Sequence, residues 1–432
     1  MGSPVLGTVG DGACRDARNR CGIVAVDMIN SMQDNDIVIL AGARTPFGNL
    51  GGELASLTAT DLAVAAAEEA IGRSGVRKEQ IDEVVFGNVI QSSADAIYLA
   101  RHVGLRTGLP VGVPALTVNR LCGSGLQAIL SAAQSLTLGS ASYALAGGTE
   151  NMSQAPHVVR GTRQGFRLGQ NVAFEDSLWT ALIDSYGNTP MAITAENLAK
   201  KYGVSRAECD EFALASQERA LAAQSNGYFA QEIVGVDVPG PKGSTVRVEK
   251  DEGPRAGLTL EKLGKLPARF VKDGVVTPGN ASGITDGAAA VVLTTVKRAR
   301  EDGLQWMGRL VSASVVGVDP SIMGIGPAFA IPKALERGGV GADDLAVVEI
   351  NEAFAPQVIA CLREMGASTG SAQAKTLNPN GGAIALGHPL GASGARLAIT
   401  ALHELRRRGG GYAIASACIG GGQGIAALFR SE

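Results

Sequence analysis

The pattern of apolar positions along this chain switches repeatedly between the spacing typical of buried strands and the spacing typical of helices. Short apolar runs predict strands at 37–41 and 83–86, and between them apolar residues recur with helical spacing at 60–74. A second series follows, with a strand at 113–118, a helix at 126–138 and a strand at 142–148. Regular alternation of this kind predicts parallel strands covered by helices, which is the arrangement of an α/β fold.

The same order of elements occurs twice along the chain. Arg73-Ser74-Gly75-Val76, which precedes the strand at 83–86, is echoed by Arg337-Gly338-Gly339-Val340 before a strand at 346–350. The glycine turn Gly123-Ser124-Gly125 is matched by Gly391-Ala392-Ser393-Gly394, and a helix and a strand follow each turn. Two such halves, lying side by side, predict a five-layer α/β/α/β/α sandwich with one shared helical layer at its centre.

A segment that lacks the alternation of strands and helices separates the two halves. It contains a helix at 206–225, for which Ser205 and Glu208 provide a capping box, and surface turns rich in proline and glycine. Inserted segments of this kind often bind a substrate or a partner. We expect an inserted loop domain at 151–268, an N-terminal half made of 36–150 and 269–305, and a C-terminal half at 306–432. Residues 1–35 predict a disordered extension, a tag remnant or a stretch upstream of the native start, with an organelle-targeting signal as the alternative.

The composition narrows the classes of function. With 432 residues and a net charge of −3, the chain lacks the strong positive charge that nucleic-acid and membrane-surface partners require. Its apolar runs are too short for a membrane span. The six cysteines show neither the spacing of a disulfide framework nor a zinc-ligand pattern, so we expect a reducing compartment and no metal site. The net charge does not exclude a small polyanionic ligand, which a local patch of the surface could bind.

Cys122 lies at a predicted strand-to-helix turn, where Gly123 and Gly125 let the backbone change direction. A thiol at a helix start meets unpaired backbone N–H groups and the positive end of the helix dipole, and both favour the thiolate. Because the thiolate is the form that attacks carbonyl carbon, Cys122 is a candidate nucleophile. The alternative is a cysteine that serves as a small residue of the core.

Two positions in the second half are candidate partners of this cysteine. Asn351 directly follows the predicted strand at 346–350, and open α/β sheets build their sites at the carboxyl ends of such strands. His388 lies between Gly387 and Pro389, which fix the backbone and aim the imidazole. The alternatives are an Asx turn at Asn351 and a satisfied core histidine at 388. The other histidines lack such rigid flanks.

A second cysteine, Cys418, comes after the last strand of the second half and is followed by Gly420-Gly421-Gly422. Glycines of this kind bring backbone N–H groups close to a neighbouring ligand, as an oxyanion hole requires. The corresponding strand of the first half ends without a cysteine. A Cys/His pair is suited to acyl transfer through a thioester, and a second thiol can be the base needed to make or break a carbon–carbon bond beside a carbonyl.

Together, four motifs resemble those of the thiolase family. They are NRLCGSG around Cys122, NEAFAPQ beginning at Asn351, GGAIALGHPLGASGAR around His388 and CIGGGQG beginning at Cys418. The resemblance runs from about Asp36 to the C-terminus and is greatest with 3-ketoacyl-CoA thiolases of the mitochondrial and bacterial β-oxidation type. It implies the thiolase form of the five-layer sandwich.

The resemblance also implies a reaction, the thiolytic cleavage of 3-oxoacyl-CoA by CoA to acetyl-CoA and a shortened acyl-CoA, together with the reverse Claisen condensation. Cys122 would carry the acyl group, His388 would take its proton, and Cys418 would be the acid and base at the α-carbon. Asn351 would hold a water that, with His388, stabilises the enolate oxygen. The N–H groups of Cys122 and Gly420 would form a second oxyanion hole.

Five further residues fall where the family binds coenzyme A: Met191, Arg255, Ser282, Met323 and Phe354. Ser282 would lie toward the pantetheine and Arg255 toward the nucleotide, whereas ordinary packing is the alternative for the other three. CoA enters as a co-substrate, with no tightly bound cofactor and no metal. The same resemblance implies a homodimer or homotetramer, in the cytoplasm of a bacterium or the mitochondrial matrix of a eukaryote.

One position departs from the pattern of the biosynthetic members. Thiolases specific for acetoacetyl-CoA often have a histidine before the methionine aligned with Met191, whereas this chain has Pro190. The difference favours a broader range of 3-ketoacyl substrates and leaves an acetoacetyl-CoA-specific thiolase as the alternative. A ketoacyl synthase would need a different His/Asn arrangement, and a non-catalytic CoA- or lipid-binding protein would lack some of Cys122, His388 and Cys418.

Overall fold

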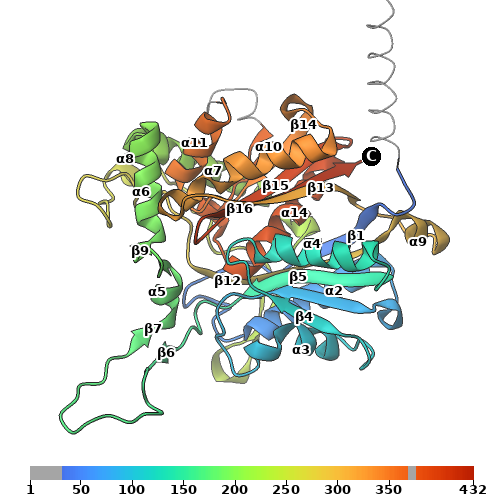
Figure 1. The fold of residues 1–432 in the computed structure, drawn as a ribbon, viewed down its shortest axis with the longest axis horizontal. Helices are drawn as coiled ribbons and strands as arrows, with labels where there is room; N and C mark the ends of the chain where they lie inside the picture. The colour runs from blue at the N-terminus through green and yellow to red at the C-terminus, as the bar shows by residue number, and fades with distance from the viewer. Residues whose placement is uncertain (1–31, 368–375) are drawn as a thin grey trace, which may run out of the picture.

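A ten-stranded mixed sheet runs through the molecule, and the computed structural model describes residues 32–367 and 376–432 (Figure 1). The strand order is β14-β15-β16-β13-β1-β12-β5-β3-β4, with β2 paired to β12. The extension expected at 1–35 lies outside the described residues except for 32–35. The strands are β1 (Ile37–Arg44), β2 (Gly48–Asn49), β3 (Glu83–Gly87), β4 (Ala115–Val118), β5 (Tyr143–Glu150), β12 (Thr285–Thr295), β13 (Gly308–Gly317), β14 (Leu345–Ile350), β15 (Gly411–Ile419) and β16 (Gln423–Ser431).

Helices lie on both faces of this sheet and between its two halves, which gives five layers. In Figure 1 the layers follow one another from α10 and α11 through β13–β16, α4 and α14, and β12 and β5 to α2 and α3. Helix α4 contacts β3 and β5, while α14 contacts β14 and β15 as well as β5 and β12, so this pair is the shared central layer. The bounds are α2 (Ala59–Ser74), α3 (Leu99–Arg106), α4 (Ser124–Thr137), α9 (Val296–Glu301), α10 (Gly326–Gly338), α11 (Ala355–Glu364), α13 (Ala383–Leu386) and α14 (Leu390–Arg407). The five-layer prediction is confirmed.

The expectation of parallel strands holds only for part of the sheet. The pairs β3–β4, β3–β5 and β14–β15 are parallel, as the helices between them predict. All pairs among β5, β12, β1, β13, β16 and β15 are antiparallel, so the prediction is wrong there. The cause is the connections: a three-residue turn at 420–422 joins β15 to β16, and so short a link reverses the chain.

The two halves repeat each other in space. From β3 to β14 the strand order is a palindrome in which β3, β5, β12 and β1 correspond to β14, β15, β16 and β13. The outer helices α2 and α10 both end at a left-handed glycine, Gly75 with φ 74° and Gly339 with φ 62°. The internal repeat read from the sequence therefore corresponds to a pseudo-twofold arrangement, with the β1–β13 pair at its centre.

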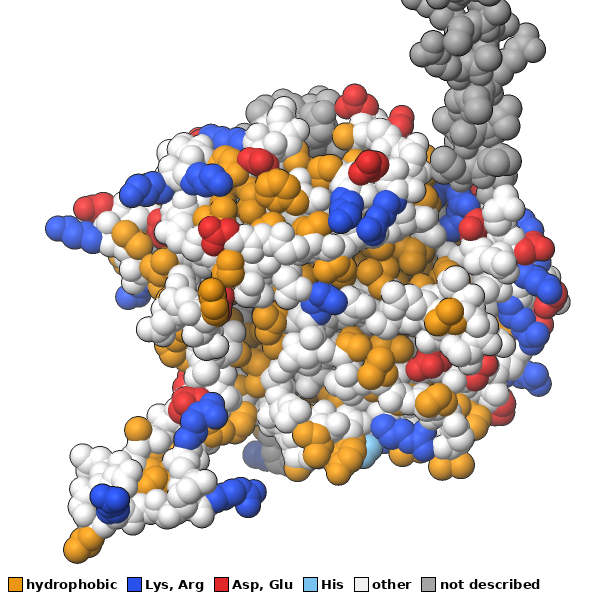
Figure 2. Space-filling view, viewed as in Figure 1, with side chains coloured by type: hydrophobic (Ala, Val, Ile, Leu, Met, Phe, Trp, Pro, Cys, Tyr) orange, Lys and Arg blue, Asp and Glu red, His pale blue; other side chains and the backbone are white. Residues whose placement is uncertain are grey.

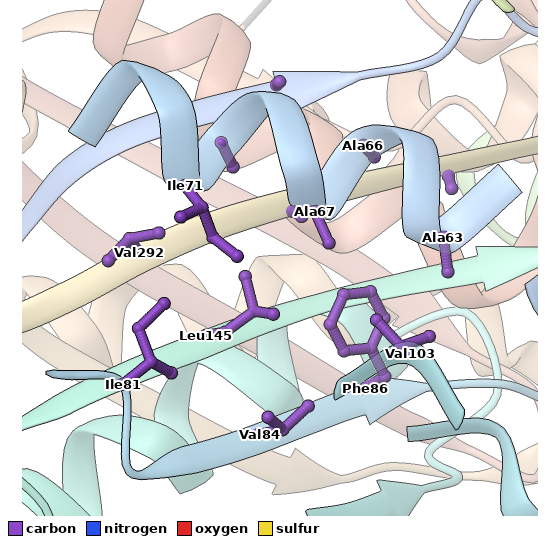
Figure 3. Packing of buried hydrophobic residues seen from close by; sticks show 14 of the residues in the cluster. Ala63, Ala66, Ala67, Ile71, Ile81, Val84, Phe86, Val103, Leu145 and Val292 are labelled. Atoms are coloured by element: carbon purple, nitrogen blue, oxygen red, sulfur yellow. The ribbon is translucent and has the colours of Figure 1, made fainter. Parts of the chain in front are cut away.

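The core of the first half forms between α2 and the sheet (Figure 3). Alanines on α2, including Ala63 and Ala67, lie over Phe86, Leu145 and Val292, and all five are fully buried. The alanines let the helix lie close to the sheet, and α2 also contributes Leu62 and Ile71 to this core. Burial of a Phe, Leu or Val side chain stabilises the fold by about 1.5–3 kcal/mol each.

The segment expected to form an inserted domain leaves the sheet after β5 and returns at β12 (left side of Figure 1). Helices α6 and α7 pack on α11, and α7 also contacts α13, so this part of the segment lies over the second half. Strands β10 and β11 pack instead into the core of the first half. The predicted capping box at the start of α7 is confirmed, because Ser205 and Glu208 each bond to the other's backbone. The elements are β6 (His157–Val158), β7 (Glu175–Asp176), α5 (Ser177–Ala181), β8 (Ile183–Asp184), β9 (Thr189–Pro190), α6 (Met191–Tyr202), α7 (Arg206–Ser225), β10 (Val236–Pro239), β11 (Thr245–Val248) and α8 (Leu260–Gly264).

On the face shown in Figure 2, positive and negative side chains are interspersed, and neither sign of charge forms a large patch. At its lower left, the hairpin built on β6 and β7 projects away from the body and ends in exposed apolar residues, among them Leu168 and Phe174. Within the described ranges, no helix combines the length and apolarity needed to cross a bilayer.

Glycines allow α4 and α14 to meet almost backbone to backbone. A Cβ on Gly394 of α14 would lie 2.4 Å from the Leu126 backbone nitrogen, and one on Gly125 of α4 would lie 2.5 Å from that of Ala395. A Cβ on Gly148 of β5 would lie 1.9 Å from the Gly391 carbonyl oxygen. Contacts this short leave no room for any side chain, so the starts of the two central helices are held against each other and against β5.

We expect Gly394→Ala to lower the free energy of unfolding by about 2–3 kcal/mol, because the added methyl forces α4 and α14 apart. The same change at Gly72 in α2 is the control, since nothing lies within 4 Å of a Cβ there. Alanine restricts the unfolded chain, so Gly72→Ala should stabilise the protein by about 0.5–1 kcal/mol. Chemical unfolding of both variants measures the difference, and equal effects would contradict the close-contact argument.

Candidate active site

Cys122 lies on a tight turn between β4 and α4. The residue before it, Leu121, has φ 46°, a left-handed conformation that is unfavourable for a leucine. Ser124 holds this turn: its hydroxyl accepts a hydrogen bond from the Arg120 N–H at 2.8 Å and donates to the Leu121 carbonyl at 2.7 Å. The strained backbone is therefore fixed by a side chain at the helix start, which directs Cys122 out of the regular elements.

The helix start, which we expected to favour the thiolate of Cys122, is outweighed by burial in the resting protein. Cys122 as a residue is partly exposed, but its sulfur is surrounded by protein atoms that replace water. Because the thiolate would lose its hydration there, burial raises the pKa of Cys122 to about 11. Backbone hydrogen bonding from Gly420 and from Cys122 itself acts in the opposite direction but does not overcome burial, and the Glu150 carboxylate adds a small increase. At neutral pH Cys122 is a thiol and needs a base.

His388 is the candidate base, and its two ring nitrogens have separate partners. Nδ1 lies 2.5 Å from Ser393 Oγ, and that hydroxyl donates to the Pro389 carbonyl at 2.9 Å. Because the single hydroxyl proton is already used, Nδ1 must carry the proton and donate to Ser393. Nε2 is then the unprotonated nitrogen, and it accepts a hydrogen bond from Asn351 Nδ2 at 3.2 Å.

The histidine is neutral as well. Burial lowers the pKa of His388 to about 3, and the positive charge of Arg396 lowers it further. A neutral thiol and a neutral imidazole therefore coexist at pH 7, so a reaction at the Cys122 sulfur must include removal of its proton.

Asn351 and Cys418 come from the ends of neighbouring parallel strands, β14 and β15. The Asn351 N–H donates to the Ser416 carbonyl at 2.9 Å, which ties the loop after β14 to β15. Cys418 is fully buried beside Met323 and Ala353. Burial raises the pKa of its thiol well above the ordinary value, and negative charge on Cys122 raises it next, so the two sulfurs lie within electrostatic range of each other.

Gly420 lies on the turn between β15 and β16, beside the nucleophile turn. A Cβ on Gly420 would lie 3.2 Å from Leu121 Cδ1 and 3.3 Å from Met191 Sδ. The structure therefore brings together four of the residues expected from the sequence, Cys122, Gly420, Cys418 and Met191. Asn351 and His388 form a hydrogen-bonded pair, and the first turns of α4 and α14 bring the His388 and Cys122 segments together.

A mostly apolar pocket of about 180 Å³ opens beside His388. Among the expected CoA contacts, Met191, Ser282 and Phe354 line this pocket, and Arg255 lines an adjoining one of about 50 Å³. The two pockets share Ala281 and Gly283, so a long ligand could occupy both. Met323 lines neither pocket and packs against Cys418 instead.

Several pocket residues were not anticipated from the sequence. Trp179, Leu182 and Phe270 come from the segment between β5 and β12, and Met152 follows β5 directly. Trp179 offered a signal, because the chain has only two tryptophans and this one lies in the insertion. The other three carry no local motif, since their position depends on how the insertion folds back over the sheet.

Glu150 is a second unanticipated feature. This carboxyl group at the end of β5 is fully buried, and burial raises its pKa to about 8, although backbone hydrogen bonds act against the rise. It accepts hydrogen bonds from the Asn88 amide and from the N–H groups of Val89, Ile90 and Gly391. Glu150 thereby fixes the start of α14, three residues after His388, to the loop after β3.

The raised pKa of Cys122 leads to a prediction about its reactivity. We expect iodoacetamide to alkylate Cys122 slowly at pH 7 and about tenfold faster for each pH unit up to roughly pH 10, since thiolate accumulates only toward pH 11. Mass spectrometry of the Cys122 peptide measures the rate, and a Cys418→Ser background removes the second site thiol. A plateau near neutral pH would contradict a neutral resting thiol.

The chain matches two family models, described as the thiolase N-terminal domain over residues 37–297 and the thiolase C-terminal domain over residues 304–431. It is 52% identical over 395 residues to the mitochondrial 3-ketoacyl-CoA thiolase of Homo sapiens, covering 91% of this chain and 98% of that protein. It is 46% identical to the acetyl-CoA acetyltransferase of Pseudomonas aeruginosa, over 90% of this chain and 98% of that enzyme. The crystal structure of human mitochondrial 3-ketoacyl-CoA thiolase in complex with CoA superposes with a TM-score of 0.88 at 50% identity, over 93% of this chain and 99% of that one. The chain therefore belongs to the thiolase family.

Proposed function

We propose that this protein cleaves 3-oxoacyl-CoA with CoA to give acetyl-CoA and a shortened acyl-CoA, and that it catalyses the reverse Claisen condensation. The observation that carries the proposal is the hydrogen-bonded series Asn351–His388–Ser393 at the pocket, with Nε2 of His388 left as a proton acceptor. Two thiols within electrostatic range of each other supply the nucleophile and a second acid–base group.

The first half of the reaction uses Cys122 and His388. Nε2 gives up its hydrogen bond from Asn351 and takes the Cys122 proton as the sulfur attacks the C3 carbonyl of the substrate, and the C2–C3 bond then breaks. Its electron pair stays on C2 as the enolate of acetyl-CoA. The cationic imidazole and a water held by Asn351 stabilise the enolate oxygen, because both donate hydrogen bonds where negative charge develops. Cys418 gives its proton to C2, and acetyl-CoA leaves.

The second half reverses these proton movements. The Cys418 thiolate takes the proton of the incoming CoA thiol, and the CoA sulfur attacks the carbonyl of the acyl group on Cys122. The N–H groups of Cys122 and Gly420 stabilise the negative oxygen of this intermediate. Cys122 departs as a thiolate and regains its proton from His388, which returns both groups to the neutral state.

We infer that CoA enters as a co-substrate through the two adjoining pockets. Ser282, Met191 and Phe354 line the part that suits the pantetheine, and Arg255 is available to the phosphates of the nucleotide. Met323 would act from behind, by supporting Cys418. The CoA complex of the human relative supports the ligand class for this fold.

We also propose the assembly and the domain division implied by the resemblance. Strand β4 is an edge strand, and its two central residues, Leu116 and Thr117, are exposed, so a second copy could continue the sheet there. A homodimer or homotetramer is therefore proposed, and sedimentation velocity tests it, since a monomer would contradict it. The domain division remains a prediction. It comprises an N-terminal half at 36–150 and 269–305, a loop domain at 151–268 and a C-terminal half at 306–432. The compartment is the cytoplasm if the source is bacterial and the mitochondrial matrix if it is eukaryotic.

The substrate range is predicted to extend beyond acetoacetyl-CoA. Pro190 lines the apolar pocket beside Trp179 and Leu182 and offers no imidazole to a short polar acyl group. We expect kcat/KM to rise with chain length from C4, by up to about fourfold per buried methylene. Steady-state rates on 3-oxoacyl-CoA from C4 to C16 test this, and Pro190→His should shift the preference back toward C4. A maximum at C4 would favour the acetoacetyl-CoA-specific alternative.

The two thiols are predicted to separate by function. Cys122→Ala should abolish formation of an acyl-enzyme from acetyl-CoA, because no other group is placed to attack the thioester. Cys418→Ala should leave that acylation largely intact and block condensation, because C2 then lacks its base. Intact-protein mass spectrometry measures acylation, and acetoacetyl-CoA formation measures condensation. Equal loss of acylation in both variants would overturn the assigned roles.

A further inference from the structure

Arg120 connects the turn that carries Cys122 with the turn that carries Gly420. Its Nη1 donates to Gln423 Oε1 at 2.7 Å, and its Nε donates to Gln127 Oε1 at 2.7 Å. Gln423 is the first residue of β16, directly after the glycine turn, while Gln127 lies on α4. One partly buried guanidinium therefore holds both sides of the site, and neither bond belongs to the chemistry already assigned.

The ladder pairs of Gln423 with Ile419 and Gly317 fix the ends of the glycine turn, and Arg120 adds a side-chain attachment on the side of Cys122. Gly421 and Gly422 have φ 78° and 84°, and three successive glycines have little intrinsic preference for one conformation. On its far side the turn is fixed to β13, because the Val318 N–H donates to the Gly422 carbonyl at 2.8 Å. On its near side, toward Cys122, Arg120 supplies the side-chain bond to Gln423.

The nucleophile side is well fixed at the same residue. The Arg120 N–H donates to Ser124, the same serine that bonds to Leu121, so the backbone from which the guanidinium extends is held in place. The contact between Leu121 and Gly420 adds packing between the two turns. Arg120 thus joins the turn before α4, which carries Cys122, to the glycine turn after β15, which carries Gly420.

We propose that Arg120 is a positioning residue that holds the Gly420 N–H at the sulfur of Cys122 through its hydrogen bond to Gln423. The proposal rests on the roles assigned above to Cys122 and Gly420. Two consequences follow from the geometry. The Gly420 N–H lowers the pKa of Cys122 in the free protein, and it donates to the negative oxygen of the intermediate during turnover.

The test compares Arg120→Ala, Gln423→Ala and the double variant with the wild-type protein. Loss of one oxyanion donor costs about 100- to 1,000-fold in kcat, so its partial displacement should cost about 10- to 100-fold. KM for acyl-CoA should stay within about twofold, because the pocket lining is untouched. The double variant should be no slower than Arg120→Ala, since both changes break the same bond.

A second readout does not depend on turnover. In Arg120→Ala, the pH profile of Cys122 alkylation should move to higher pH, because the thiolate loses the Gly420 hydrogen bond. Arg120→Lys retains a donor for Gln423 and should recover part of both effects. Arg337→Ala is the control: this arginine donates to the Ala313 carbonyl at 2.6 Å, between α10 and β13, and its loss should change neither kcat nor the alkylation profile.

The outcomes separate this inference from the proposed function. If wild-type protein cleaves 3-oxoacyl-CoA but Arg120→Ala matches Arg337→Ala in kcat and alkylation, the positioning role is wrong. Multiplicative losses in the double variant would also overturn it, since Arg120 and Gln423 would then act separately. If wild-type protein turns over no 3-oxoacyl-CoA, the proposed function fails, while the alkylation profiles still decide whether Arg120 acts on Cys122 through Gly420.

Discussion

The contact between the starts of α4 and α14 is the constraint on which the rest of the site depends. Gly125 and Gly394 bring the two helix backbones together, and Gly148 brings β5 against them. Cys122 immediately precedes one of these helices and His388 the other, so the same contact sets how close nucleophile and base can come. Glu150 reinforces this contact by accepting a hydrogen bond from the Gly391 N–H at the start of α14. A side chain at either glycine would displace the segments that carry Cys122 and His388, because no space for a Cβ is present there.

The pseudo-twofold relation of the two halves explains how one chain makes a single asymmetric site. Ser124 and Ser393 occupy corresponding places at the starts of the central helices, and each donates to a carbonyl one turn earlier. The first serine also accepts a backbone N–H and fixes a strained turn, whereas the second accepts a ring N–H and fixes a histidine tautomer. One repeated contact thus supports the candidate nucleophile in one half and the candidate base in the other.

Local sequence signals predicted much of the fold and of the candidate site. The features that were not predicted depend on contacts between residues far apart in the sequence. The repeat, the capping box of α7 and the five layers follow from spacing and from residues close in sequence. The antiparallel pairing of β12 with β5 depends on where β12 returns after a long insertion, which no local pattern specifies. The antiparallel β15–β16 pair, by contrast, had a local signal in the short glycine turn at 420–422. Trp179 and Phe270 reach the pocket for the same reason. The raised pKa of Cys122 could not be predicted, because helix position can be read from sequence, whereas burial by other segments cannot.

Burial of both reacting groups gives the site its control over reactivity. A thiolate–imidazolium pair formed in the empty site would lose the hydration of two charges, and their mutual attraction repays only part of that loss. The pKa values of about 11 for Cys122 and about 3 for His388 express this balance. A substrate changes it by supplying a carbonyl oxygen on which charge can accumulate beside N–H donors that are already oriented. Burial therefore keeps Cys122 in the thiol form, which is the less nucleophilic of its two forms, until its proton is removed.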